Sequence, residues 1–221
     1  MSNYLETIDN QIAEKNLLKH PFYLAWTRGE LSREALTDYA RQYYHHVAAF
    51  PTYLSAVHAR CDDQATRKQL LDNLVDEEAG SPNHPDLWIK FAEGLGVEDA
   101  RNAEQQPETK SLVQAFRAAC GEGLTAEGLA ALYAYESQIP AICESKIDGL
   151  KKYYGFTDPE HYRYFSVHIE ADREHSAAER QMLKAHVNDH NFEDVKASVE
   201  RVLNALWEML SGVCRRHAIA C

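Results

Sequence analysis

The 221-residue sequence has little of what marks several large classes of protein. It contains only 10 glycines and 7 prolines, and it shows no Gly/Ser/Pro-rich linker, low-complexity tract or internal repeat, which argues against a modular or disordered chain. No stretch approaches the roughly 18 apolar residues of a membrane span. The five cysteines include no C-x-x-C pair, as is typical of a reduced protein without a disulfide framework.

Positive charge is also scarce, because 23 lysines and arginines face 34 aspartates and glutamates, for a formal net charge of −11. Such a chain is repelled by phosphate backbones and anionic membranes, so we expect no nucleic-acid partner and no membrane partner. Residues 1–6 lack the basic and apolar regions of a signal peptide. We therefore expect a single domain over residues 1–221, located in the cytoplasm.

No segment alternates apolar and polar residues over six or more positions, so no strand is predicted. Apolar residues instead recur at steps of three and four, which predicts helices. The longest cover 32–59, 126–154 with an interruption at Pro140, 158–186, and a stripe from Val195 to Val213. We expect an all-α bundle of seven or eight helices.

The predicted helix over 158–186 carries unusual side chains on its buried face. It begins with an Asp-Pro-Glu pattern, in which the aspartate caps the helix and the proline takes its first position. His168, Asp172 and His175 then follow at steps of four and three residues, which places them on one face. Burying them is costly unless they are paired or bind a metal, and this set suits iron, manganese or zinc.

Three more polar side chains are expected on buried faces. Glu136 lies on the apolar stripe of the 126–154 helix. In the helix that Asp62 or Asp63 caps, where Leu70, Leu71, Leu74 and Val75 are expected to face inward, Glu77 shares the buried side. Glu78 fits that stripe almost as well, and His84 follows Glu77 by seven residues. The candidate ligands are Glu77, His84, Glu136, His168, Asp172 and His175.

Three carboxylates and three imidazoles suit two divalent ions, with a bridging oxide or hydroxide to balance the charge and positions open for oxygen. The alternative is a structural hydrogen-bond network, which must provide a partner for every one of these groups. The Glu-x-x-His pairs of ferritin-like sites are missing, so the architecture must differ from theirs.

This spacing resembles that of the haem-oxygenase-like di-metal oxidases. A glutamate, six residues and a histidine are followed by an isolated Tyr135-Glu136 pair and then by His-x₃-Asp-x₂-His. The branch most similar comprises the chlamydial protein associating with death domains and its bacterial relatives, which make p-aminobenzoate. The resemblance covers nearly the whole chain, implies a haem-oxygenase-like bundle and selects Glu77 over Glu78.

In that branch a tyrosine of the protein is understood to supply the aromatic ring and a lysine the amino nitrogen. The matching positions are Tyr23 and Lys146. The pocket-type tyrosines are Tyr39, Tyr135 and Tyr164. The resemblance also implies two transition-metal ions (Fe/Fe or Fe/Mn), molecular oxygen, a reductant from an electron donor, and a homodimer. Lys146 lies on a buried stripe, where desolvation would favour the neutral amine, although an ordinary snorkelling lysine is the alternative.

Other functions stay open from the sequence. A di-iron oxygenase of the same fold that acts on a small external substrate would need neither Tyr23 nor Lys146. A thiaminase-like hydrolase could use Cys143 as its nucleophile, but it would not explain three histidines. A haem oxygenase is disfavoured because the early histidine, His20, precedes a proline. A death-domain-binding protein would leave the buried polar residues unexplained.

Overall fold

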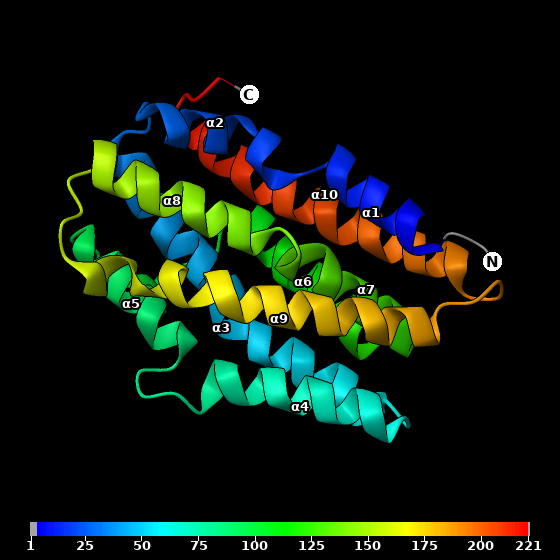
Figure 1. The fold of residues 1–221 in the computed structure, drawn as a ribbon. Helices are drawn as coiled ribbons and strands as arrows, with labels where there is room; N and C mark the ends of the chain where they lie inside the picture. Colours follow the sequence, from blue (N-terminus) through cyan, green and yellow to red (C-terminus); the bar gives the residue numbers. More distant parts are fainter. Residues whose placement is uncertain (1–3, 221) are drawn as a thin grey trace.

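The structure is a computed structural model that describes residues 4–220. Within this range it contains ten α-helices, three 3₁₀ turns and no strand, so the predicted all-α class is confirmed (Figure 1). The α-helices are α1 (Tyr4–Glu14), α2 (Pro21–Arg28), α3 (Arg33–Arg60), α4 (Gln64–Glu78), α5 (His84–Gly94), α6 (Pro107–Gly121), α7 (Thr125–Glu136), α8 (Ile139–Tyr153), α9 (Arg163–His186) and α10 (Phe192–Arg216). The 3₁₀ turns are η1 (Leu17–Lys19), η2 (Ala100–Asn102) and η3 (Pro159–Tyr162).

The helices surround one continuous apolar core. The long helix α3 packs against α4, α5 and α6, while α9 packs against α7 and α8, and α10 covers α6 and α7. Figure 1 shows α10 beside α1 and α2 on one side of the molecule and α4 at the opposite side. The core between them is strongly aromatic. Its largest fully buried side chains include Trp26, Trp88, Phe91, Phe116 and Phe165.

Two helix boundaries differ from the prediction. The segment predicted over 126–154 is divided at residues 137 and 138 into α7 and α8, because Pro140 in the first turn of α8 has no backbone N–H to continue the helix. The division of this segment into two helices is one reason why the predicted number of seven or eight helices was too low.

The segment predicted over 158–186 begins with the 3₁₀ turn η3, and α9 starts only at Arg163. Asp158 does accept a hydrogen bond from the Glu160 amide, at 3.0 Å, but it caps the turn rather than the long helix. Tyr162, with φ −125° and ψ 13°, separates the two.

Helix α4 buries fewer apolar side chains than the sequence predicts. Leu70 is buried and Leu74 half-buried, but Leu71 and Val75 are 46% and 49% exposed, so the prediction that these two face inward was wrong. At about 100° per residue the four side chains span an arc of about 140° on the helix. The strip of α4 that the bundle covers is narrower and is centred on Leu70 and Glu77. Because α4 lies at the edge of the bundle, only one of its faces is covered (Figure 1).

No helix within residues 4–220 is long and apolar enough to cross a bilayer. The four cysteines in this range are buried and form no disulfide, whereas Cys221 lies outside the described residues.

The contact between α2 and α8 is unusually close at Gly149. A Cβ atom there would lie 2.5 Å from Nε1 of Trp26. The same Nε1 donates a hydrogen bond to the carbonyl of Lys146, at 3.3 Å. This close approach holds the helix that carries Tyr23 against the helix that carries Lys146.

We expect Gly149→Ala to lower the free energy of unfolding by about 1 to 3 kcal/mol, because the added methyl group overpacks the contact with Trp26. The gain of up to about 1 kcal/mol from replacing a helical glycine is included in this expectation. Gly121→Ala is the matched control, since a Cβ at Gly121 would meet nothing within 4 Å. Urea denaturation measures both variants, and equal stabilities would contradict the close contact.

Candidate metal centre

Six buried side chains form two groups of three at the centre of the bundle. In each group, one ligand atom from every residue lies within 4.8 Å of the others, and every member is at most 8% exposed. The first group is Glu77, His84 and His168, and the second is Glu136, Asp172 and His175. The structure therefore brings together all six candidate ligands of the sequence analysis, from α4, α5, α7 and α9. Glu78, the alternative to Glu77, is exposed.

The first group is arranged around the Glu77 carboxylate. Oε1 of Glu77 lies 3.0 Å from Nδ1 of His84 and 3.8 Å from Nε2 of His168. Burial alone would raise the pKa of Glu77, but the neighbouring imidazoles of His168 and His84 lower it to about 2. Nδ1 of His168 lies 2.6 Å from the Tyr164 carbonyl, to which it donates its proton, so Nε2 keeps a lone pair that faces the carboxylate.

The second group is arranged around His175. Its Nδ1 lies 3.6 Å from Oδ1 of Asp172 and 3.8 Å from Oε1 of Glu136. Its other nitrogen, Nε2, lies 3.0 Å from a carboxylate oxygen of Asp76. A carboxylate behind a histidine commonly fixes the ring orientation of a metal ligand, so Asp76 supports Nδ1 as the ligand atom.

The buried nitrogens of the two groups provide a test of whether a metal fits. Nδ1 of His84 and Nδ1 of His175 are both buried and have no hydrogen-bond partner in the described chain, although each faces a carboxylate at short distance. Buried polar atoms are nearly always hydrogen-bonded. Converging lone pairs without hydrogen-bond geometry are expected of atoms that surround a cation, and this set of donors suits iron and manganese. The residues therefore fit two transition-metal ions.

Two further polar residues contact Glu136, and neither was identified from the sequence. Nδ2 of Asn73 donates to both carboxylate oxygens of Glu136, at 3.1 and 3.2 Å. Glu179 is fully buried, and burial together with the neighbouring Glu136 raises its pKa well above the usual range. Burial likewise raises the pKa of Glu136, to about 7. Glu179 could have been found from its spacing, because it follows Asp172 by seven residues on the same face of α9.

A second buried cluster joins Lys146 to two of the predicted tyrosines. Nζ of Lys146 donates to the Tyr39 hydroxyl at 2.6 Å and lies 5.4 Å from the centre of the Tyr23 ring. The hydroxyls of Tyr23 and Tyr39 are 3.4 Å apart. Burial lowers the pKa of Lys146 to about 7, so the amine is largely uncharged at slightly alkaline pH.

Tyr43 links this cluster to the metal-ligand groups. Its hydroxyl donates to the Tyr135 hydroxyl at 2.9 Å, and its ring centre lies 5.2 Å from that of Tyr39. Tyr135 precedes Glu136 in the chain, and the ring of Tyr164 lies 4.0 Å from that of His168. Of the predicted tyrosines, Tyr39 therefore belongs to the lysine cluster, whereas Tyr135 and Tyr164 adjoin the ligand groups. Tyr43 connects the two regions.

The residues of two rival functions are engaged in structural roles. Cys143 is buried, and burial raises the pKa of its thiol, which disfavours the thiolate that a nucleophile requires. His20 accepts a hydrogen bond from the Phe22 amide through Nδ1, and its Nε2 lies 3.0 Å from the Ser211 hydroxyl. Neither ring nitrogen of His20 is left to bind a haem iron.

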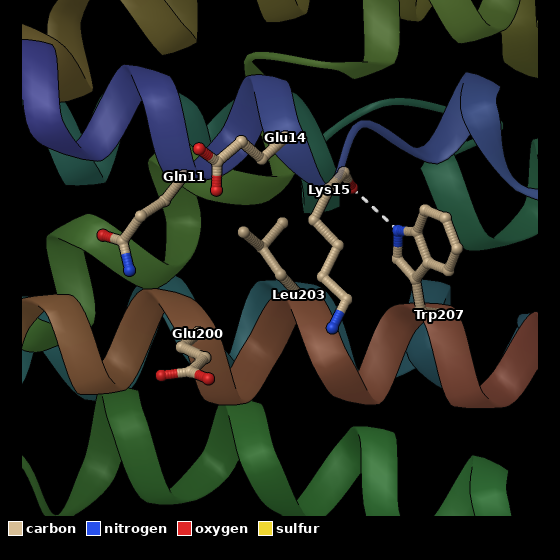
Figure 2. Close-up of a pocket in the computed structure, with 6 residues that line it drawn as sticks. All are labelled: Gln11, Glu14, Lys15, Glu200, Leu203 and Trp207. Carbon is tan, nitrogen blue, oxygen red and sulfur yellow. Dashed lines mark hydrogen bonds between the residues drawn. The ribbon is translucent and has the colours of Figure 1, made fainter.

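A groove of about 500 Å³ on the outer surface lies away from these residues, between α1 and α10 (Figure 2). Figure 2 shows the Trp207 indole donating to the Lys15 carbonyl, a bond of 2.7 Å. The groove contains none of the six candidate ligands, so it is not the chemical site.

The chain is similar in sequence to a family of redox enzymes and to curated synthases. The profile of the family described as iron-containing redox enzymes matches residues 37–207. A 4-aminobenzoate synthase of Chlamydia pneumoniae is 47% identical over 213 residues, which cover 96% of this chain and 95% of that protein. A 4-aminobenzoate synthase of Nitrosomonas europaea is 44% identical and covers 96% of this chain and 91% of its own.

Solved structures support the fold. A CADD-like protein from Nostoc punctiforme superimposes with a TM-score of 0.78 at 15% identity, covering 97% of this chain and 94% of its own. A protein with a haem-oxygenase-like fold from Shewanella denitrificans gives a TM-score of 0.80 at 18% identity, covering 96% of this chain and 91% of its own. The resemblance predicted from the ligand spacing is confirmed, and the chain belongs to the family of haem-oxygenase-like, iron-containing redox enzymes.

Proposed function

We propose that the protein is a metal-dependent oxidase that makes 4-aminobenzoate, with the ring of Tyr23 as its carbon source and Lys146 as its nitrogen donor. The observation that carries the proposal is the buried amine of Lys146, which contacts Tyr39 at 2.6 Å and lies beside the Tyr23 ring. An oxygenase with an external substrate would not require a lysine in this position. The high identity to 4-aminobenzoate synthases supports the same activity.

In this proposal each group of three residues holds one metal ion. Glu77, His84 and His168 would bind one, while Glu136, Asp172 and His175 would bind the other. Both iron and manganese accept these ligand types, so the pair is Fe/Fe or Fe/Mn. When bound, the ions would activate molecular oxygen and supply the oxidising power, with electrons from a reductant outside the chain.

The protein's own residues then determine which ring is oxidised. Tyr43 and Tyr135 provide a hydrogen-bonded aromatic path from the ligand groups to Tyr39 and Tyr23. The Tyr39 hydroxyl, between the Tyr23 hydroxyl and the Lys146 amine, can accept and pass on a proton. The exclusion of water from this cluster keeps the amine neutral and therefore able to act as a nucleophile.

The overall chemistry is consistent with this pairing of residues. Tyrosine and 4-aminobenzoate share a ring with two substituents in para positions. In the conversion the nitrogen of Lys146 replaces the phenolic oxygen of Tyr23, so the Cε–Nζ bond of the lysine breaks and the oxygen leaves as water. The Cα–Cβ bond of Tyr23 also breaks, and Cβ is oxidised to the carboxylate carbon with molecular oxygen as the oxidant. Each chain can therefore react only about once.

We propose that the enzyme has no nucleic-acid or membrane partner, because its charge of −11 opposes both. A cytoplasmic location stays a prediction from the sequence. Assembly as a homodimer stays a prediction from the family resemblance.

We expect the purified protein to bind two transition-metal ions per chain. Glu136→Ala and His168→Ala should each lose at least one of them, because each variant removes a ligand from a different group. Metal should also raise the melting temperature of the wild type more than that of either variant, since a ligand that binds only the folded state stabilises it. Elemental analysis measures the stoichiometry, and a full complement of metal in both variants would exclude the assignment.

We expect Tyr23→Phe to abolish formation of 4-aminobenzoate when the protein is supplied with iron or iron plus manganese, a reductant and oxygen. Phenylalanine lacks the phenolic oxygen that allows the ring to be oxidised. Tyr44→Phe is the control, because the Tyr44 hydroxyl contacts Arg101 rather than the cluster, and it should leave the yield unchanged. Undiminished product from Tyr23→Phe would point to an external substrate.

We expect the initial rate of product formation to rise with pH through about 7, because the lowered pKa of Lys146 makes the nucleophilic amine the minor form below that value. The rate should fall about tenfold for each further unit of acidity. The metals are loaded at one pH and the pH is then shifted, so that metal binding does not dominate the profile.

Lys146→Arg should give no product at any pH, because a guanidinium stays protonated. Lys152→Arg, an exposed substitution on the same helix, should match the wild type. An initial rate that is constant between pH 6 and 8 would argue against Lys146 as the donor.

A further inference from the structure

A narrow cleft of about 180 Å³ lies between α4 and α9, next to the second group of candidate ligands. Its lining includes four carboxylates and no lysine or arginine, all of them in the described part of the chain. The carboxylates belong to Asp72, Asp76, Glu174 and Glu179. The cleft therefore has a negative potential that attracts cations.

The acidic side chains extend from the surface toward the buried ligands. Asp72 and Glu174 are exposed, and the side chain of Asp76 is 58% exposed. His175 and Glu179 form the inner, buried part of the lining. Since His175 is a candidate ligand and Asp76 contacts it at 3.0 Å, the cleft connects solvent to the metal centre.

Glu179 is the unusual member of this lining. It is only 1% exposed, and neither of its carboxylate oxygens has a hydrogen-bond partner among the described residues. Its carboxyl group lies beside that of the candidate ligand Glu136. Two carboxyl groups buried side by side are unfavourable unless they share a proton or hold a cation between them. Since no other donor among the described residues reaches Glu179, its position suits a cation ligand.

We propose that this cleft is the route by which divalent cations reach the buried ligands, and that Glu179 is a transient ligand that passes each ion to Glu136. The proposal rests on the metal centre proposed above. The outer carboxylates concentrate hydrated cations at the mouth of the cleft. Glu179 then offers an oxygen ligand that replaces part of the hydration shell before the ion reaches its final site.

The test follows the uptake of Mn²⁺ alone by the metal-free, full-length protein. Loss of the electron paramagnetic resonance signal of free Mn²⁺ gives the rate, and elemental analysis at equilibrium gives the stoichiometry. Asp72→Asn/Glu174→Gln should slow uptake about tenfold at low ionic strength, with a smaller effect at high salt, because it removes electrostatic attraction. Glu179→Gln should slow uptake at both ionic strengths and leave the final stoichiometry unchanged.

The matched control is Asp194→Asn/Glu200→Gln, which removes the same two charges from exposed positions on α10, at the opposite side of the bundle (Figure 1). Its uptake rate should equal that of the wild type. Equal slowing of both double variants would show a general effect of net charge and would overturn the proposal. Uptake by Glu179→Gln at the wild-type rate would also overturn the proposal. A reduced stoichiometry in that variant would overturn it too, because Glu179 would then be a permanent ligand. If the wild type itself bound no metal, the proposed function would fail as well.

Discussion

The structure depends most on the burial of six imidazole and carboxylate side chains at the centre of a helical bundle. An uncompensated buried charge costs several kcal/mol, a large fraction of the about 5 to 15 kcal/mol by which domains of this kind are stable. The two groups reduce this cost by facing carboxylates toward imidazoles, and Asn73 and Asp76 supply hydrogen bonds from the side of α4. The Nδ1 atoms of His84 and His175 have no hydrogen-bond partner among the described residues, and bound cations would remove the cost of burying them.

Burial disfavours positive charge at Lys146, whereas the ligand groups favour bound cations. This contrast between the two regions defines the site. Around the ligand groups, carboxylates outnumber positive charges and favour cations. Around Lys146, aromatic rings and phenolic hydroxyls offer no carboxylate partner, so burial favours the neutral amine. The Tyr43 to Tyr135 hydrogen bond joins the two regions. The candidate metal ligands and the buried amine are thus kept apart but connected within one core.

Helical spacing explains how much of this site could be predicted from the sequence. His168, Asp172 and His175 recur at steps that require a shared face, and α9 shows that face buried. The same rule could have identified Glu179. It could not separate Glu77 from Glu78, because both lie near the apolar stripe, and it placed Leu71 and Val75 wrongly because α4 is covered on one side only.

Asp76 and Asn73 could not be predicted, since their roles depend on how α4 packs against other helices. The approach of Tyr23 to Lys146 likewise depends on the fit of Trp26 against Gly149.

The central claim is that the metal centre oxidises a tyrosine of the protein itself. The most direct measurement uses protein labelled with ring-¹³C tyrosine during expression and then supplied with metal, reductant and oxygen in the presence of unlabelled free tyrosine. Mass spectrometry of the released 4-aminobenzoate should show the full ring label, in an amount of at most about one molecule per chain. Unlabelled product, or many molecules per chain, would contradict the account.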